Sequence, residues 1–271
     1  MVQIKRGSMK PNHTALKPPL KWAGGKRWLM PKLAQIWAKH QHRRLVEPFC
    51  GGLSVALGLQ PQTALLNDVN PALINFYQQC QKGLKVDIDL ENDEILYYQH
   101  RTLFNALNQQ GIEINKAAQL FYYLNRTGYN GLCRFNQSGG YNVPFGRYKT
   151  INYQEDFFHY QQQLNQWQFT QQDFAELAIE DDDFIYADPP YDVPFRQYAQ
   201  KGFDWEDQER LAVWLAQHKG PVLVSNQATP RIKELYKDLG FKLKYIDAPR
   251  RISCKGNGRQ DAKEVLASHG L

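Results

Sequence analysis

The chain has few cysteines and no long apolar segment, and each shortage argues against a class of protein. Its 271 residues include four cysteines, which form no Cys-x-x-Cys pair and lie near no cluster of histidines. This spacing argues against a disulfide framework and a zinc site, so we expect reduced thiols in a cytoplasmic protein that needs no metal. No apolar run approaches the ~18 residues of a membrane-spanning helix, and the N-terminus lacks the apolar core of a signal peptide. We therefore expect no membrane partner.

Acidic residues are missing from two long stretches. Residues 1–46 contain eleven Lys or Arg and no acid, and residues 114–154 contain five basic residues and no acid. Five acids lie together in residues 87–94. Segregated positive charge suits a polyanion such as nucleic acid, although a solvated basic face has the same composition.

Apolar and aromatic residues are plentiful, and their pattern predicts an α/β fold. Hydrophobic residues make up 42% and aromatic residues 13% of the chain, which is enough for a full core. After a loose basic arm at residues 1–18, we expect helices and strands to alternate. Helices are expected at 28–37, 53–59, 94–107, 116–124, 205–217 and 231–239, and strands at 44–49, 63–66, 167–170, 184–187, 221–225, 241–246 and 264–267. This alternation predicts a mostly parallel sheet covered on both faces.

The expected strand at 184–187 ends in Asp188-Pro189-Pro190-Tyr191. The prolines cannot donate to a ladder, so the chain must leave the sheet there. Ligands of open α/β sheets bind at the carboxyl ends of strands. One carboxylate, one carbonyl and one flat ring suit a planar amine, whose two hydrogens the two acceptors would hold while the ring stacks. An ordinary strand-end turn with a capping Asp is the alternative.

A strand, a glycine turn and a helix follow one another at residues 44–59. The glycines of Cys50-Gly51-Gly52 let a ligand approach the backbone at a helix N-terminus. Asp68 follows the next strand, 21 positions after Glu47, an offset at which an acid meets ribose hydroxyls. Gly24-Gly25-Lys26 is not a phosphate loop, because the first glycine of that motif would fall at Leu20 and Arg27 replaces its Ser or Thr.

Residues 125–148 interrupt this pattern with frequent Gly, Asn and Pro, which predict loops and a hairpin. Their side chains are mostly Arg, Asn and aromatics, the types that contact phosphates, read base edges and stack on bases. A long irregular segment in a compact chain is usually functional or disordered, and the aromatics argue against disorder. We interpret it as an inserted recognition element.

At this point the chain resembles the Dam-type DNA adenine-N6 methyltransferases, which use S-adenosylmethionine. Four motifs carry the resemblance, in the family's order: Lys21-Trp22-Ala23-Gly24-Gly25-Lys26, Glu47-Pro48-Phe49-Cys50-Gly51-Gly52, the segment 125–148, and Asp188-Pro189-Pro190-Tyr191. The resemblance implies a Rossmann-like seven-stranded sheet with an inserted helical and hairpin target-recognition domain. It implies that residues 1–70 and 161–271 form the S-adenosylmethionine-binding catalytic domain and residues 71–160 the DNA target-recognition domain. It also implies double-stranded DNA as partner, GATC as target, association with the nucleoid and a monomeric protein.

The resemblance assigns three sets of residues. Asp188, Pro189, Pro190 and Tyr191 form the catalytic set around the target amine. The set around the methyl donor is Trp22, Lys26, Glu47, Phe49, Gly51, Asp68, Asp173, Phe174 and Asp188. Within it, Asp68 is expected on the ribose, and Asp173 with Phe174 on the donor's adenine.

The third set contacts DNA: Lys21, Arg126, Tyr129, Asn130, Leu132, Arg134, Asn136, Pro144, Arg147 and Tyr148. Among these, Arg126 resembles a phosphate contact, and Tyr129 and Asn130 resemble residues that enter the helix beside the extruded base. Leu132, Arg134 and Pro144 resemble base readers. Cys133 departs from the family, whose members tend to carry a bulkier residue there.

The motif also defines a chemistry. Accepting both amine hydrogens at Asp188 and Pro189 localises the nitrogen lone pair for in-line attack on a sulfonium methyl, with positioning and electrostatics supplying the rate. The base must leave the duplex for this, and neither a cysteine nucleophile nor a metal is needed. Methylation of cytosine-N4, of an RNA adenine or of a glutamine amide is an alternative, and Asp before Pro189 disfavours the first and last. A catalytically silent DNA-binding relative is the alternative from another class.

Overall fold

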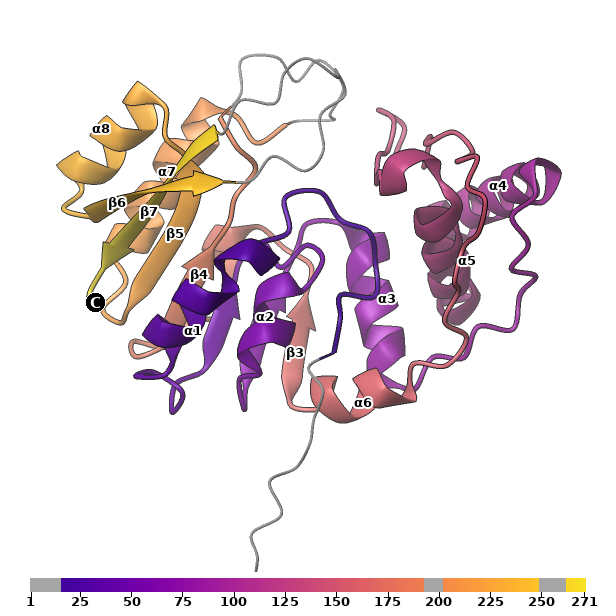
Figure 1. Cartoon of the computed structure of the whole chain (residues 1–271), viewed down its shortest axis with the longest axis horizontal. Coiled ribbons are helices and arrows are strands. Elements are labelled where there is room, and N and C mark those ends of the chain that lie inside the picture. Colours follow the sequence, from indigo (N-terminus) through magenta and orange to yellow (C-terminus); the bar gives the residue numbers. More distant parts are fainter. Residues whose placement is uncertain (1–15, 193–201, 249–261) are drawn as a thin grey trace, which may run out of the picture.

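The computed structural model describes residues 16–192, 202–248 and 262–271. Most of the expected N-terminal arm and the basic segment 250–256 lie outside these ranges. One sheet organises the described chain (Figure 1), in the order β3-β2-β1-β4-β5-β7-β6. Its strands are β1 Leu45–Glu47, β2 Ala64–Asn67, β3 Trp167–Thr170, β4 Phe184–Ala187, β5 Val222–Gln227, β6 Lys242–Ala248 and β7 Ala262–His269. The first five strands of this order pair in parallel, and β7 is antiparallel to both β5 and β6. The expected Rossmann-like seven-stranded sheet is confirmed.

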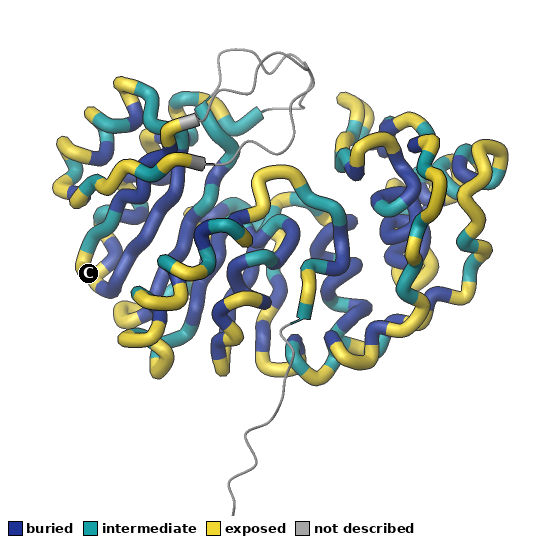
Figure 2. Tube along the Cα trace, in the orientation of Figure 1, coloured by how far each residue is buried: buried dark blue, intermediate teal, exposed yellow. Residues whose placement is uncertain are grey.

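The central strands are buried on both faces, and their alternating side chains enter two separate cores. On β4, Phe184 and Tyr186 join the larger apolar cluster, whereas Ile185 and Ala187 join the smaller one. Successive side chains of a strand point to opposite faces, so each cluster marks one face of the sheet. Figure 2 shows these strands buried along their length.

Helices cover both faces. They are α1 Met30–Trp37, α2 Ser54–Leu59, α3 Pro71–Gln81, α4 Glu94–Gln110, α5 Ile114–Thr127, α6 Phe158–Leu164, α7 Trp205–Ala216 and α8 Pro230–Asp238, with 3₁₀ turns η1 Arg27–Leu29, η2 Tyr129–Gly131 and η3 Phe174–Glu176. Residues of α1 and α2 belong to the larger cluster and residues of α7 and α8 to the smaller one. No helix in the described part of the chain is both long and apolar enough to cross a membrane.

The sequence patterns missed α3 and α6. The start of α3 carries two signals of a helix N-terminus: Pro71 at the first position, and an Asn70 side chain that accepts hydrogen bonds from the amides of Ala72 and Leu73. The helix packs against α5 and also against β3. The larger core therefore continues without a break from the sheet into the helices of segment 71–160.

Segment 71–160 lies beside the sheet, at the end away from β6 and β7 (Figure 1). Its helices α4 and α5 pack together, and residues 128–148 return along them. The expected hairpin exists here only as isolated antiparallel bridges, Gly128 to Phe145 and Phe135 to Tyr141. Side chains replace the ladder: Asn136, for example, uses its Oδ1 to accept from the amides of Ser138 and Gly140.

Candidate active site

Asp188 lies immediately after β4, and both of its carboxylate oxygens have partners. Oδ2 forms an ion pair of 2.8 Å with Nζ of Lys26, and Oδ1 accepts a hydrogen bond of 2.9 Å from Oγ of Ser225 on the neighbouring strand β5. Burial raises the pKa of the Asp188 carboxyl, while Lys26 and then Ser225 act to lower it. The carboxylate is therefore fixed in direction by two strands and one ammonium group.

Lys26 is the buried cation of this site, with a side chain only 2% exposed. Besides Asp188, its ammonium donates to the carbonyl of Gly24 at 3.1 Å and to the Tyr191 hydroxyl at 2.8 Å. The three donors of the ammonium are thus all used. One side chain connects the N-terminal motif with the turn after β4.

The turn itself is held from α7. Gln208 donates from Nε2 to the carbonyl of Pro190 at 2.8 Å, and Asn226 of β5 donates to Oε1 of Gln208 at 2.9 Å. Gln208 and Asn226 are both buried. The sequence patterns had not singled out Lys26 as a partner of Asp188, nor Ser225 and Gln208 as supports of the turn.

The glycine turn before α2 lies under Trp22. Gly51 adopts φ +44°, and a Cβ atom there would lie 2.7 Å from the indole Nε1. A Cβ atom on Gly52 would lie 2.7 Å from Cβ of Trp22. Only glycine lets the backbone of this turn approach the Trp22 side chain so closely. Trp22 of the N-terminal motif thus lies against the turn.

Two carboxylates flank this turn. Asp68 accepts hydrogen bonds from the amides of Gly51 at 3.2 Å and Asn70 at 3.0 Å, and burial raises its pKa to about 6. Glu47, at the end of β1, is buried, and its Oε1 has no hydrogen-bond partner among the described residues. Burial raises the pKa of Glu47 well above its usual range, and the nearby charge of Asp188 adds to this shift. Such an oxygen is an acceptor without a donor.

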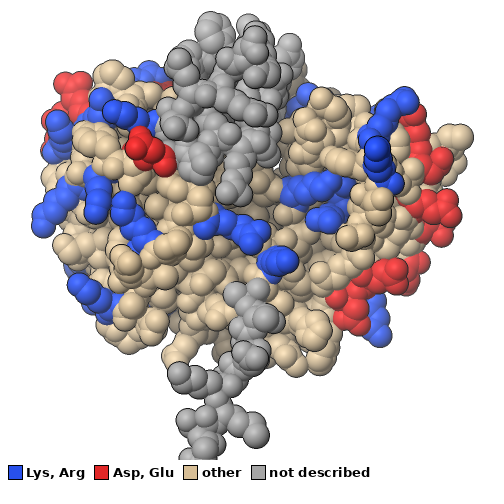
Figure 3. Space-filling model, viewed as in Figure 1, with Lys and Arg blue, Asp and Glu red and all other residues tan. Residues whose placement is uncertain are grey.

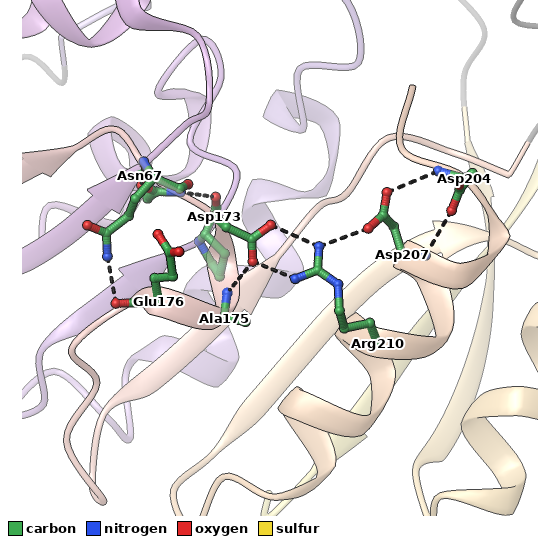
Figure 4. Close-up of polar contacts among 9 residues, drawn as sticks. Asn67, Asp173, Ala175, Glu176, Asp204, Asp207 and Arg210 are labelled. Carbon is green, nitrogen blue, oxygen red and sulfur yellow. Dashed lines mark hydrogen bonds and ion pairs between the residues drawn. The ribbon is translucent and has the colours of Figure 1, made fainter. Parts of the chain in front are cut away.

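Asp173 and Phe174 lie just after β3, and Arg210 of α7 contacts both. Figure 4 shows the Arg210 guanidinium against the Asp173 carboxylate. Its guanidinium donates to the two oxygens of Asp173 at 2.6 and 2.8 Å and lies 4.3 Å above the Phe174 ring. Asp173 also accepts from the amide of Ala175, and Arg210 lowers the pKa of the Asp173 carboxyl. Because Asp207 accepts a further bond from Arg210, the start of α7 is tied to this corner. The sequence patterns missed Arg210, which lies 37 positions from its partner.

Phe49 extends this corner towards the glycine turn. Its ring centroid lies 5.8 Å from that of Phe174. The expected donor-binding carboxylates therefore occupy one edge of the sheet: Glu47 at the end of β1, Asp68 after β2, Asp173 after β3 and Asp188 after β4. This is the edge formed by the carboxyl ends of the parallel strands.

Lys21 joins the N-terminal motif to segment 71–160. Its backbone exchanges two hydrogen bonds with the buried Asn125 amide, and its Nζ donates to the carbonyl of Arg126 at 2.8 Å. The ammonium also lies 3.8 Å from the centre of the Tyr148 ring. Partial burial, together with the charge of Arg126, lowers the pKa of Lys21 to about 8. In this structure Lys21 therefore contacts protein groups, at the junction where DNA was expected.

The expected DNA contacts fall into two groups. The exposed ones present their side chains to solvent: Tyr129, Asn130, Arg134, Asn136, Pro144 and Arg147. Tyr129 is 51% exposed, and Asn130 beside it adopts φ +53°, the left-handed conformation that holds the tip of the η2 turn outward. Arg134 is braced by Asn142, which accepts from its Nε at 2.7 Å, and Arg147 pairs with Glu94 at 3.2 Å.

The other expected contacts also make bonds within the protein. Arg126 donates to the carbonyl of Asn152 at 3.0 Å, and Tyr148 donates to that of Gly128 at 2.9 Å. Leu132 is half-buried against the larger core. The exposed Asn136 also makes such bonds, with the amides of its own turn. Figure 3 shows Lys and Arg side chains across the middle of the visible face and acids at the outer edge of segment 71–160.

A Rossmann-like sheet whose strand ends bring together an Asp-Pro-Pro-Tyr turn, a glycine turn and three further carboxylates defines a methyltransferase architecture. Residues 22–252 match the family described as D12 class N6 adenine-specific DNA methyltransferase. The chain belongs to this family, and the resemblance seen in its motifs is confirmed. The protein is therefore an enzyme that methylates adenine in DNA.

Individual relatives agree. The chain is 36% identical over 266 residues to the retron Ec67 DNA adenine methylase of Escherichia coli, covering 93% of this chain and 90% of the relative. It is 35% identical over 267 residues to the DNA adenine methylase of Escherichia coli strain K12, covering 92% and 93%. It is 36% identical over 282 residues, 97% of this chain, to the DNA N-6-adenine-methyltransferase of Escherichia phage P1, and spans 37% of that protein's length.

Proposed function

We propose that this enzyme transfers a methyl group from S-adenosylmethionine to N6 of an adenine flipped out of duplex DNA, with GATC as its target. The observation that carries the proposal is the Asp188 carboxylate, aimed by Lys26 and Ser225 at the edge of the sheet where the glycine turn also lies. An anionic acceptor fixed beside a donor-binding turn suits an amine as substrate. The protein would act in the cytoplasm, on the DNA of the nucleoid, as a monomer.

The residues at the sheet edge fit S-adenosylmethionine, which supplies an electrophilic methyl group on a sulfonium sulfur when bound. The unpartnered Oε1 of Glu47 suits the ammonium of the donor's methionine end. Asp68 retains lone pairs for ribose hydroxyls after accepting its two amide bonds. Asp173, held as a carboxylate by Arg210, suits the amine of the donor's adenine, and Phe174 with Phe49 forms the apolar wall beside it.

The chain's own groups would prepare the target amine. Asp188 accepts a hydrogen bond from one N–H of the amine, and the carbonyl of Pro189 accepts one from the other. These two bonds draw the nitrogen towards a tetrahedral geometry. Lys26 opposes the rise in pKa that burial imposes on Asp188, and so favours the ionised form, which accepts hydrogen bonds and does not donate. Tyr191 stacks on the base and thereby fixes its plane.

For recognition, we propose that segment 71–160 is the target-recognition domain and that residues 1–70 and 161–271 form the catalytic domain. Tyr129 and Asn130 project from the η2 turn, where they can fill the space left by a flipped base. Arg134 and Pro144 lie exposed on the same irregular segment and would read base edges, with Arg147 near the backbone. Lys21 would reach a base flanking the target by leaving the Arg126 carbonyl.

Transfer of a labelled methyl group tests the proposal. Purified enzyme with labelled S-adenosylmethionine should label the adenine of a GATC duplex. Three other substrates should be labelled poorly: a duplex with GTTC, a duplex with cytosine in place of the target adenine, and RNA of the matching sequence. Asp188→Asn should lower the rate at least about 100-fold, since it removes the charge of the acceptor. Asp181→Asn is the matched control, because Asp181 carries the same group just before β4 with its side chain 76% exposed.

The outcomes separate the alternatives. Transfer to RNA in preference to DNA, or to cytosine-N4, would replace the proposed substrate. Donor binding by calorimetry without transfer to any DNA would identify a catalytically silent relative. Equal labelling of GATC duplexes and of duplexes with a scrambled sequence would refute GATC as the target, but not the methylation of adenine.

A further inference from the structure

Glu264 of β7 is a buried carboxylate that the proposed reaction does not yet use. Its side chain is 6% exposed, and its Oε2 has no hydrogen-bond partner among the described residues. Burial raises the pKa of this carboxyl, whereas Lys26 and Tyr191 oppose the shift. A buried carboxylate with an unpaired oxygen costs folding free energy, so stability does not explain its presence.

The alternation of β7 places Glu264 on the face of the active site. Val265 and Ala267 enter the smaller core, whereas Leu266 enters the larger one, on the face covered by α1 and α2. Glu264 shares the face of Leu266 because it lies two residues before it. The Lys26 ammonium reaches Asp188, which by the alternation of β4 shares the face of Tyr186 and hence of the larger core.

Oε1 of Glu264 accepts the hydrogen bond that the Tyr191 hydroxyl donates. That hydroxyl in turn accepts from Nζ of Lys26, whose ammonium pairs with Asp188. A phenol has one proton to donate, so its donation to Glu264 turns its lone pairs towards Lys26. The order of groups along this path is Glu264, Tyr191, Lys26 and Asp188.

We propose that Glu264 is a positioning residue for methyl transfer, which fixes the Tyr191 ring and the Lys26 ammonium by accepting the Tyr191 proton. This inference rests on the proposed function, in which Tyr191 stacks on the target base. Without the acceptor, the hydroxyl is free to turn its proton towards Asp188 and to compete with the amine for that carboxylate. The ring also loses the hydrogen bond that joins it to β7.

The chain offers substitutions that separate acceptance from charge. Glu264→Met keeps the approximate length of the side chain, suits an apolar environment and removes the acceptor. Glu264→Gln removes the charge but keeps an amide oxygen that can accept from Tyr191. Tyr191→Phe removes the donor and keeps the ring. Glu234→Met is the control, since Glu234 lies exposed on α8.

The decisive measurement is the single-turnover rate of methyl transfer at saturating donor and duplex. We expect Glu264→Met and Tyr191→Phe each to lower it about tenfold, the scale of one lost hydrogen bond to a charged acceptor. The double variant should be no slower than either single variant, because both changes remove the same bond. Glu264→Gln should retain most of the rate, and Glu234→Met all of it. The dissociation constant for S-adenosylmethionine should stay unchanged in the Glu264 variants.

A second measurement needs no turnover. A duplex with 2-aminopurine at the target position reports stacking of the flipped base through its fluorescence emission. Relative to the wild-type complex, the emission should change by the same amount and in the same direction in the Glu264→Met and Tyr191→Phe complexes. The melting temperature of Glu264→Met should not fall, which separates positioning from a structural role.

Several results would overturn the inference. One is a double variant whose rate falls by the product of the two single losses, because the two side chains would then act independently. Another is a wild-type rate in Glu264→Met. A third is a rate in Glu264→Gln as low as that of Glu264→Met. Failure of the wild-type enzyme to methylate any DNA would instead refute the proposed function. The 2-aminopurine emission would still test the role of Glu264, because that measurement needs no methyl transfer.

Discussion

Replacement of Lys26 by methionine tests the central ion pair of the site. The substitution keeps a long, unbranched side chain but removes the ammonium that pairs with Asp188 at 2.8 Å. Ser225 then remains as the partner of that carboxylate. The charge of Asp188 stays in its buried position without the cation that compensates it.

The expected loss of stability follows from the burial of the pair. Removing one partner of a buried ion pair costs about 3–5 kcal/mol. The Asp188 side chain is still 20% exposed, so we expect the lower end of that range, about 3 kcal/mol. At roughly 2–4 °C per kcal/mol for a chain of about this size, the melting temperature should fall by roughly 6–12 °C at neutral pH.

The pH dependence gives the sign of the effect. The folded-state pKa of Asp188 is already raised by burial, and loss of Lys26 raises it further. A carboxyl whose pKa is higher in the folded than in the unfolded protein lowers the free energy of unfolding as the pH rises through the interval between the two pKa values. The deficit of Lys26→Met should therefore shrink as the pH is lowered. The acidic limb of the methyl-transfer rate should move to higher pH, because Asp188 must be ionised to accept the amine hydrogen.

Thermal unfolding and single-turnover rates between pH 5 and 9 measure both effects. Lys219→Met is the matched control: Lys219 pairs with Asp181 at 2.7 Å, but these side chains are 73% and 76% exposed. Such a pair contributes within about 0.5 kcal/mol, so this variant should unfold and react like the wild type. An acidic limb that stays in place in Lys26→Met, at a lowered rate, would show that Lys26 does not act through the ionisation of Asp188.

Three further predictions concern the donor and the recognition segment. Because the pKa of Asp68 lies at about 6, the KM for S-adenosylmethionine should rise as the pH falls through 6. This pH dependence of KM should vanish in Asp68→Asn; if it persists, another group causes it. Arg210→Ala should raise that KM about tenfold with kcat little changed, since it frees the Asp173 carboxylate to rotate; equal losses in kcat would contradict a role in donor binding alone. Asn136→Ala should lower the melting temperature through a loss of about 1 kcal/mol, and Asn136→Asp, which keeps the acceptor, should restore it; a variant that weakens DNA binding at wild-type stability would make Asn136 a direct contact.

Much of the fold could be predicted because its signals are local. The apolar run of β4, its two terminal prolines and the alternation of strands with helices each act over a few residues. The two missed helices show the limit of such patterns. Asn70-Pro71 is a sound helix start, but the mixed polar and apolar content of α3 reflects burial against both α5 and β3, which no local period reveals.

The site divides in the same way. The sequence by itself determined the motifs and their order, and with them the class of enzyme, because Asp188-Pro189-Pro190-Tyr191 and the glycine turn are contiguous. Only the tertiary structure decided which polar side chains of the site contact one another. Lys26 meets Tyr191 across 165 positions and Glu264 meets it across 73, distances along the chain that no spacing rule connects. The sheet brings these groups together, since parallel strands collect their carboxyl ends at one edge and β7 returns beside them.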